Sequence, residues 1–197
     1  METKRLFIGL VIDQKLTDAI MQETISLEGG LWRITPASNL HITVIFLGDV
    51  LEGIIPDVKT IVENIASRTR PFALTGGRTR IMQPDEPTML WMRYERNSWF
   101  ERLVADAESC FKRIGTWERQ LDRKHRKTRG GDRYAIPHIT LARVRGGGML
   151  DSLLPPIESS RATELFMARK IALFSSQYDK KTEAAHYEKL GEWDLED

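Results

Sequence analysis

The 197-residue chain has little cysteine, no long apolar run and almost no net charge. A single cysteine, Cys110, rules out an intramolecular disulfide and a cysteine-rich zinc site, so packing must supply the stability. The apolar runs fall far short of the ~18 residues that span a bilayer, and the first residues lack the pattern of a cleavable secretory signal. We therefore expect a cytoplasmic protein without a transmembrane helix.

The charge balance is even overall and uneven in one place. Lys and Arg number 29 against 28 Asp and Glu, so the net charge of +1 gives no general reason to expect nucleic acid. Residues 119–133, however, carry seven basic and two acidic side chains, a local balance of +5. Two interpretations stay open: a solvated loop around Gly130-Gly131, or a segment that contacts phosphate. In the second, the RNA-contacting residues would be Arg123, Lys124, Arg126 and Lys127.

Hydrophobic residues make up 41% of the chain and charged residues 29%, the balance of a globular protein with a core. Apolar periodicity predicts helices over residues 13–27, with Asp13 as N-cap, and over 53–67, 99–114 and 149–154. Runs of β-prone residues between turn signals predict strands over residues 5–12, 31–34, 40–47, 72–80, 88–94, 136–144, 164–174 and 184–193. This mixed order, without a Rossmann or P-loop glycine fingerprint, predicts an α+β fold.

Two short motifs repeat in the two halves of the chain. His41-Ile42-Thr43 returns 97 residues later as His138-Ile139-Thr140, although the chain has only four histidines. Both copies lie in β-branched sequence, and side chains two apart on a strand share a face. Each copy therefore offers an imidazole beside a hydroxyl, and strands from the two halves can bring both pairs to one cleft.

Such a set of groups suits a phosphodiester. Its opening by water needs a base, an acid and donors for the non-bridging oxygens, which two His and two Thr can supply. With an ordinary pKa near ~6.5, one ring can be neutral and the other protonated without a large shift, so no metal is required. Zinc is the weaker interpretation, because the repeated partner is Thr. His125 and His186 have no Thr two places on, and we assign them no catalytic role.

Further segments around these motifs resemble those of a known family. They are Arg5-Leu6-Phe7, Leu31-Trp32-Arg33, NLHITVIFLG at 39–48, PHITLARV at 137–144, Leu173-Phe174-Ser175-Ser176 and Tyr187-Glu188-Lys189-Leu190. Over nearly its whole length the chain resembles the two-histidine phosphoesterases, most closely the RNA 2′,3′-cyclic phosphodiesterases, historically described as 2′-5′ RNA ligases. The resemblance implies one bilobal α+β domain over residues 1–197, with pseudo-two-fold symmetry. Antiparallel sheets would flank a central cleft, with helices on the outer faces.

The resemblance also implies an activity without a cofactor: hydrolysis of an RNA 2′,3′-cyclic phosphate end to a 2′-phosphate. In this scheme His138 activates water and His41 protonates the leaving oxygen, or the reverse, while Thr43 and Thr140 bind phosphate oxygens. Arg143 either contacts phosphate or pairs with a carboxylate at the strand end, and on a regular strand it would face away from His138. Phe46 either stacks on a base or fills the core.

The basic segment before Pro137 is longer and more charged than the family usually has, which is consistent with a place at the mouth of the cleft. Two other functions stay open: ligation of a cyclic end to a 5′-hydroxyl, and binding of RNA or nucleotide phosphates without catalysis. The sequence does not choose between an RNA such as a tRNA fragment and a small cyclic nucleotide. No feature predicts an obligate partner, so we expect a monomer.

Overall fold

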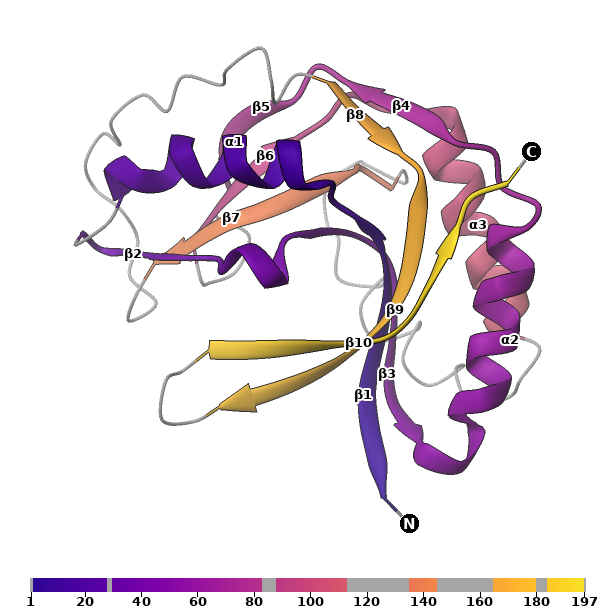
Figure 1. The fold of residues 1–197 in the computed structure, drawn as a ribbon. Helices are drawn as coiled ribbons and strands as arrows, with labels where there is room; N and C mark the ends of the chain where they lie inside the picture. The colour runs from indigo at the N-terminus through magenta and orange to yellow at the C-terminus, as the bar shows by residue number, and fades with distance from the viewer. Residues whose placement is uncertain are drawn as a thin grey trace.

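The computed structural model describes residues 2–27, 30–82, 88–112, 135–144, 165–179 and 184–196. They form a mixed α+β fold in which all the strand pairs are antiparallel, so the predicted fold class is confirmed (Figure 1). In this part of the chain, none of the helices has the length and apolar character needed to cross a membrane. The basic segment at 119–133 and the helix expected at 149–154 lie outside the described residues.

The main sheet has the strand order β10-β9-β1-β3-β7-β6-β5, with β2 paired to the side of β7. Its strands are β1 (Thr3–Val11), β2 (Trp32–Ile34), β3 (His41–Leu51), β5 (Arg78–Met82), β6 (Met89–Arg93), β7 (His138–Val144), β9 (Lys170–Asp179) and β10 (Ala184–Asp194). A second, two-stranded sheet pairs β4 (Phe72–Thr75) with β8 (Leu165–Ala168).

The two halves of the main sheet meet where β3 pairs with β7. In the described chain the register of this pair joins Ile42 to Ile139, the central residues of the two His-x-Thr motifs. Because these isoleucines are equivalent in the two motifs, a pseudo-two-fold axis passes between them. The other strands diverge from this point, and Figure 1 shows β1, β9 and β10 on one side and β5, β6 and β7 on the other. The fold therefore brings the two motifs together at the junction.

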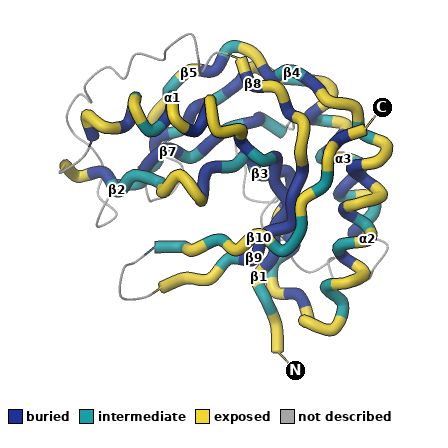
Figure 2. Tube along the Cα trace, in the orientation of Figure 1, coloured by how far each residue is buried: buried dark blue, intermediate teal, exposed yellow. Residues whose placement is uncertain are grey.

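The helices are amphipathic, as their sequence periodicity predicts. They are α1 (Gln14–Thr24), α2 (Ile55–Ala66) and α3 (Ser98–Lys112), with short 3₁₀ turns η1 (Ile25–Leu27), η2 (Ala37–Asn39) and η3 (Glu52–Ile54). The Asp13 carboxylate caps α1 by accepting a hydrogen bond of 2.8 Å from the backbone N–H of Leu16, as expected. Helices α2 and α3 pack on each other and on the half that contains β3 and β9, with their buried stripes turned inward (Figure 2). The opposite face of this half is not covered by α2 and α3, and this face lies at the junction.

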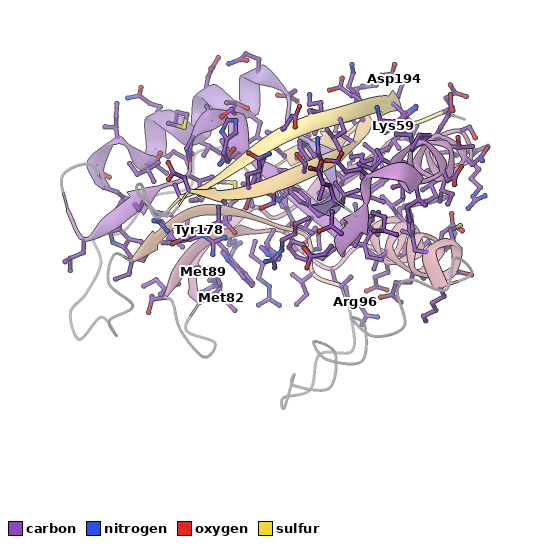
Figure 3. The ribbon with its side chains drawn as sticks, turned by 90° about the horizontal axis from the view of Figure 1, so that it is seen from below. Lys59, Met82, Met89, Arg96, Tyr178 and Asp194 are labelled. Atoms are coloured by element: carbon purple, nitrogen blue, oxygen red, sulfur yellow. The ribbon has the colours of Figure 1, made fainter. Side chains whose placement is uncertain are left out.

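The view at 90° to Figure 1 shows how far the two halves extend. Lys59 of α2 and Asp194 of β10 lie near one another, away from Met82 and Met89 of the β5–β6 pair (Figure 3). Helix α2 contacts β10 directly, so the C-terminal strand belongs to the half of the sheet that α2 covers.

Three expected strand boundaries were wrong. The single strand expected over 164–174 is divided after Ala168, so that β8 pairs with β4 and β9 runs from Lys170 to Asp179 in the main sheet. The single strand expected over 72–80 is divided at Gly76, where φ is +68°, so that β4 joins β8 and β5 joins β6. A Cβ at this glycine would lie 2.5 Å from the Glu95 side chain, so both the backbone and the space require glycine. The strand expected to close at Gly48 instead continues to Leu51, because Gly48 adopts φ of +70° beside a register shift against β1.

Candidate active site

Strands β3 and β7 present their His-x-Thr motifs in the same way. In each strand the His and Thr side chains are partly exposed, and the isoleucine between them is fully buried. His41 and Thr43 share one face of β3, and His138 and Thr140 share one face of β7, as the alternation along a strand requires. All four side chains line the same cleft.

Beyond each threonine this alternation is interrupted. Two consecutive residues are buried in each strand, namely Val44 and Ile45, and Leu141 and Ala142. The pairing with the neighbouring strand shifts register beside these positions, and a bulge returns the next side chain to the first face. Arg143 therefore lines the cleft with His138, because β7 does not keep the regular alternation under which this side chain would face away. Phe46, equivalent to Arg143 in the repeat, lines the cleft and is 50% exposed, so it does not fill the core.

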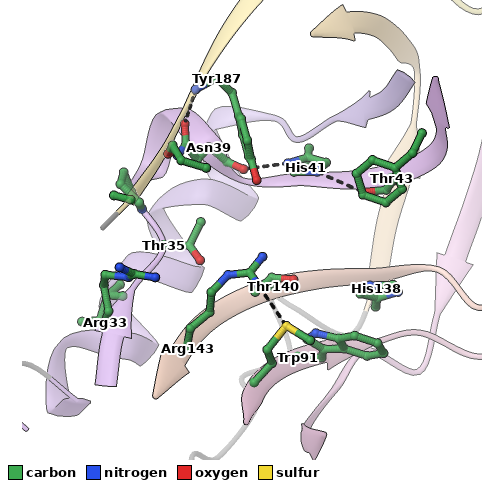
Figure 4. A pocket seen from close by; sticks show the side chains of 16 residues that line it. Arg33, Thr35, Asn39, His41, Thr43, Trp91, His138, Thr140, Arg143 and Tyr187 are labelled. Carbon is green, nitrogen blue, oxygen red and sulfur yellow. Dashed lines mark hydrogen bonds between the residues drawn. The ribbon is translucent and has the colours of Figure 1, made fainter. Parts of the chain in front are cut away.

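The cleft has a volume of about 430 Å³, within the range of small-molecule sites (Figure 4). Besides the two His-x-Thr pairs, it is lined by Arg33, Ile34, Thr35, Pro36, Asn39, Phe46, Met89, Trp91, Arg143, Ala184, Ala185 and Tyr187. None of these described lining residues is a carboxylate, and two of them are arginines. The charge of the lining therefore favours an anion. Nowhere in the described chain do three His, Cys, Asp or Glu side chains gather as a metal site would need.

Backbone carbonyls fix the tautomer of both imidazoles. His41 Nδ1 lies 2.7 Å from the carbonyl oxygen of Asn39, and His138 Nδ1 lies 3.0 Å from that of Ile136. A carbonyl only accepts hydrogen bonds, so Nδ1 carries the proton in each ring and Nε2 is left as the acceptor. His41 Nε2 is 3.0 Å from Thr43 Oγ1, so the hydroxyl donates to it. Each ring thus presents a basic nitrogen to the cleft.

Aromatic rings surround the two imidazoles differently. Trp91 of β6 stacks on His138 with a centroid distance of 3.7 Å and an interplanar angle of 19°. His41 instead lies among Phe7, Phe174 and Tyr187, at centroid distances of 4.7, 5.8 and 5.3 Å. Trp91 is the strand partner of Thr140, and the strand partner of the equivalent Thr43 is Gly9. Gly9 therefore takes the position of Trp91 in the other half. A Cβ there would lie 3.1 Å from the Ile42 carbonyl oxygen and 3.3 Å from His41 Cδ2, so only glycine leaves His41 undisturbed.

Burial lowers the pKa of both histidines. The pKa of His41 falls from 6.5 to about 4, chiefly because burial penalises the charged ring, and repulsion from the charged form of His138 and from Arg143 lowers it further. Burial likewise lowers the pKa of His138, with Arg93 and Arg143 adding to the effect. In each case the hydrogen bond to the backbone carbonyl opposes the shift. Both rings are therefore neutral near pH 7 in the free protein, and the expectation of one protonated ring without a large shift was wrong.

Asn39 is a site residue that the sequence reasoning missed. Its side chain is almost fully buried, donates to the Ala185 carbonyl oxygen at 2.7 Å, and accepts from the Tyr187 backbone N–H at 3.3 Å. These bonds tie the start of β10 to the residues just before His41, and they hold Tyr187 against His41 (Figure 4). The sequence signal was the Asn two places before the first motif, but its partners lie about 150 residues away in sequence.

Arg33, Thr35, Met89, Trp91 and Tyr187 also line the cleft without having been singled out as site residues. Their inclusion depends on strand pairing between distant segments, which no local pattern encodes. His186 is exposed and does not line the cleft. The basic candidates Arg123, Lys124, Arg126 and Lys127 lie outside the described residues.

Comparisons with known proteins agree with this arrangement. A family model for LigT-like phosphoesterases matches residues 13–91, which include the first motif. A curated RNA 2′,3′-cyclic phosphodiesterase of Methanothermobacter thermautotrophicus is 24% identical over 152 residues, 76% of each chain. Another, from Thermus thermophilus, is 27% identical over 140 residues, covering 71% of this chain and 68% of that protein.

Solved structures show the same fold. The apo form of Escherichia coli LigT superposes with a TM-score of 0.72 at 20% sequence identity, covering 100% of both chains. A protein of Thermus thermophilus gives a TM-score of 0.72 at 22% identity over 97% of each chain. The family model, the relatives, the fold and the paired His-x-Thr motifs agree in making the chain similar to the LigT-like phosphoesterases.

Proposed function

We propose that this protein hydrolyses the 2′,3′-cyclic phosphate at an RNA end to a 2′-phosphate, without a metal ion. The observation that carries the proposal is the pair of His-x-Thr motifs on β3 and β7, which present two imidazole Nε2 atoms and two hydroxyls to one cleft without a carboxylate among its described lining residues. The names of the two curated relatives support the substrate, and the side chains present supply a base, an acid and phosphate donors.

In the proposed reaction His138 Nε2 accepts a proton from a water molecule, whose oxygen attacks phosphorus. A bond forms between phosphorus and the water oxygen, and the bond between phosphorus and O3′ breaks. His41 Nε2 gives a proton to O3′, so the product carries a 2′-phosphate and a 3′-hydroxyl. Once His41 Nε2 carries its own proton, the Thr43 hydroxyl no longer donates to the ring, so Thr43 and Thr140 donate to the non-bridging oxygens. Arg143 balances the negative charge that develops on them.

Because the pKa of His41 is low, the ring acts as an acid only after the bound substrate has raised this pKa. In the free cleft this ring is neutral at pH 7, because its pKa lies at about 4. A phosphate anion bound beside the ring favours the imidazolium form and raises the pKa. Proton uptake is therefore coupled to substrate binding, and the acid is charged only when the substrate is in place.

The test uses a short RNA that ends in a 2′,3′-cyclic phosphate, incubated with purified protein in excess EDTA. We expect a 2′-phosphate product, and we expect a loss of about 10²–10⁴-fold in kcat/KM in each of His41→Ala and His138→Ala. His186→Ala is the matched control, since this histidine is exposed and outside the cleft. Full activity in either cleft variant, or a requirement for a metal, would overturn the proposal.

The products also distinguish the other two functions. A 2′-5′-linked product from RNA with a free 5′-hydroxyl would show that ligation proceeds in the same cleft, with the hydroxyl in place of water. RNA that binds but keeps its cyclic end would show a phosphate-binding protein. Since water is far more abundant than RNA ends, we expect hydrolysis to dominate unless binding aligns the two ends.

A further inference from the structure

Two arginines of the cleft lie directly opposite one another on neighbouring strands. Arg33 of β2 pairs with Arg143 of β7 in the antiparallel register, and both line the cleft. Like charges placed directly opposite on a sheet destabilise the pairing. The described lining of the cleft holds no carboxylate, so the two charges add in their effect on an anion that enters it.

The arginine pair is displaced from the histidines along the cleft. Figure 4 shows His138 at one end, Arg143 in the middle, and Thr35 and Arg33 toward the other end. The charge of Arg143 lowers the pKa of both histidines, so its guanidinium also acts at the reaction centre. Arg143 lies three positions after Thr140 along β7, which is about 10 Å at most for an extended strand. Arg33 thus extends the anion-binding surface beyond the atoms that hold the reacting phosphate.

The backbone fixes the position of this outer surface. The Thr35 N–H donates to the Leu141 carbonyl oxygen at 2.8 Å, directly after the short β2 strand, and so continues the attachment of this segment to β7. Thr35 also lines the cleft, between the two arginines in Figure 4. A guanidinium binds phosphate oxygens with two parallel N–H donors, and a threonine hydroxyl adds a third. This end of the cleft therefore has the donors and the charge of a phosphate site.

We propose that Arg33 and Thr35, together with Arg143, form a second phosphate subsite that holds the phosphate on the 5′ side of the terminal nucleotide. This inference rests on the proposed function, in which the cyclic phosphate occupies the space between the histidines. The next phosphate of the same strand then lies at the arginine end. The preferred substrates are accordingly RNA ends and 5′-phosphorylated nucleotides, rather than nucleoside 2′,3′-cyclic phosphates with a free 5′-hydroxyl.

The kinetic test compares adenosine 2′,3′-cyclic phosphate with the same molecule carrying a 5′-phosphate. We expect kcat/KM to be about 10-fold or more higher for the 5′-phosphorylated substrate, as charge-assisted hydrogen bonds imply. In Arg33→Gln the ratio of the two values should fall close to one, and Arg33→Lys should restore part of it. Arg102→Gln, which removes an exposed arginine from α3, is the matched control and should keep the ratio. Equal rates for the two substrates in the unaltered protein would overturn the subsite.

A binding measurement separates this inference from the proposed function. Adenosine 2′-phosphate and adenosine 2′,5′-bisphosphate are titrated calorimetrically against the unaltered protein and Arg33→Gln. We expect the bisphosphate to bind at least about 10-fold more tightly to the unaltered protein, and we expect this advantage to disappear in the variant. If neither cyclic substrate is hydrolysed but the advantage is found, the hydrolytic function fails and the second subsite stands. If hydrolysis occurs but the advantage is missing, the subsite fails alone.

Discussion

Replacement of the half-buried His41 by Gln should make the stability of the protein less dependent on pH. The ring has an ordinary pKa of 6.5 in the unfolded chain and about 4 in the folded protein, because burial penalises its charged form. Between these two values the unfolded chain binds a proton that the folded protein does not bind. Stability is therefore fully present above pH 6.5 and is lost as the pH falls toward 4.

The magnitude follows from the two pKa values. For a single group titrating at 6.5 unfolded and at about 4 folded, the stability lost between pH 7.5 and pH 5 is about 2 kcal/mol. His138 contributes in the same direction, because its pKa is also lowered. The unaltered protein should therefore lose at least this amount, and His41→Gln should lose about 2 kcal/mol less over the same interval.

Urea unfolding at pH 7.5 and pH 5 measures the effect, with the free energy of unfolding determined for each protein at each pH. His186→Gln serves as the control, because this histidine is exposed, and it should follow the unaltered protein. The comparison uses differences between the two pH values, so a constant change in stability caused by the substitution cancels. An equal pH-dependent loss in His41→Gln and in the unaltered protein would refute the assignment of this ring as a half-buried neutral base.

Two further substitutions probe groups that position the histidines. Trp91→Leu removes the ring that stacks on His138, and it should lower kcat by roughly 2- to 30-fold with a smaller change in KM, because the aromatic face stabilises positive charge on the imidazole. Trp91→Phe should recover most of the loss, and a loss confined to KM would contradict this role. Asn39→Ala breaks the hydrogen bonds to Ala185 and Tyr187. It should lower the urea midpoint of unfolding and raise KM. An unchanged KM would show that this link does not shape the cleft.

The two halves of the cleft share a backbone and differ in the side chains attached to it. The His-x-Thr pairs and the bonds from Nδ1 to the backbone are repeated, whereas Phe46 stands where the other half has Arg143. Trp91 similarly stands where the first half has Gly9. An approximately symmetric cleft with unequal walls favours one orientation of an asymmetric substrate. This difference gives a physical basis for distinct roles of His41 and His138.

The sequence by itself determined the motif pairs, the fold class and most of the elements. Helix and strand periodicities reflect which side chains each element buries, and the predicted helices at 13–27, 53–67 and 99–114 correspond to α1 with η1, to η3 with α2, and to α3. The repeat of His41-Ile42-Thr43 at His138 indicated one shared site, because side chains two apart on a strand share a face.

Only the tertiary structure decided which other residues reach the site and which ionisation state its histidines adopt. The side chain of Arg143 turned into the cleft because of a bulge, and a bulge depends on the pairing with a neighbouring strand, not on the strand's own sequence. Trp91 and Arg33 reached the cleft through pairing with β7, a segment distant from both in the sequence. The pKa of His41 fell to about 4 because the folded chain removes the ring from water. Local sequence encodes propensity and side-chain alternation, whereas register, burial and solvation are set only when distant segments pack together.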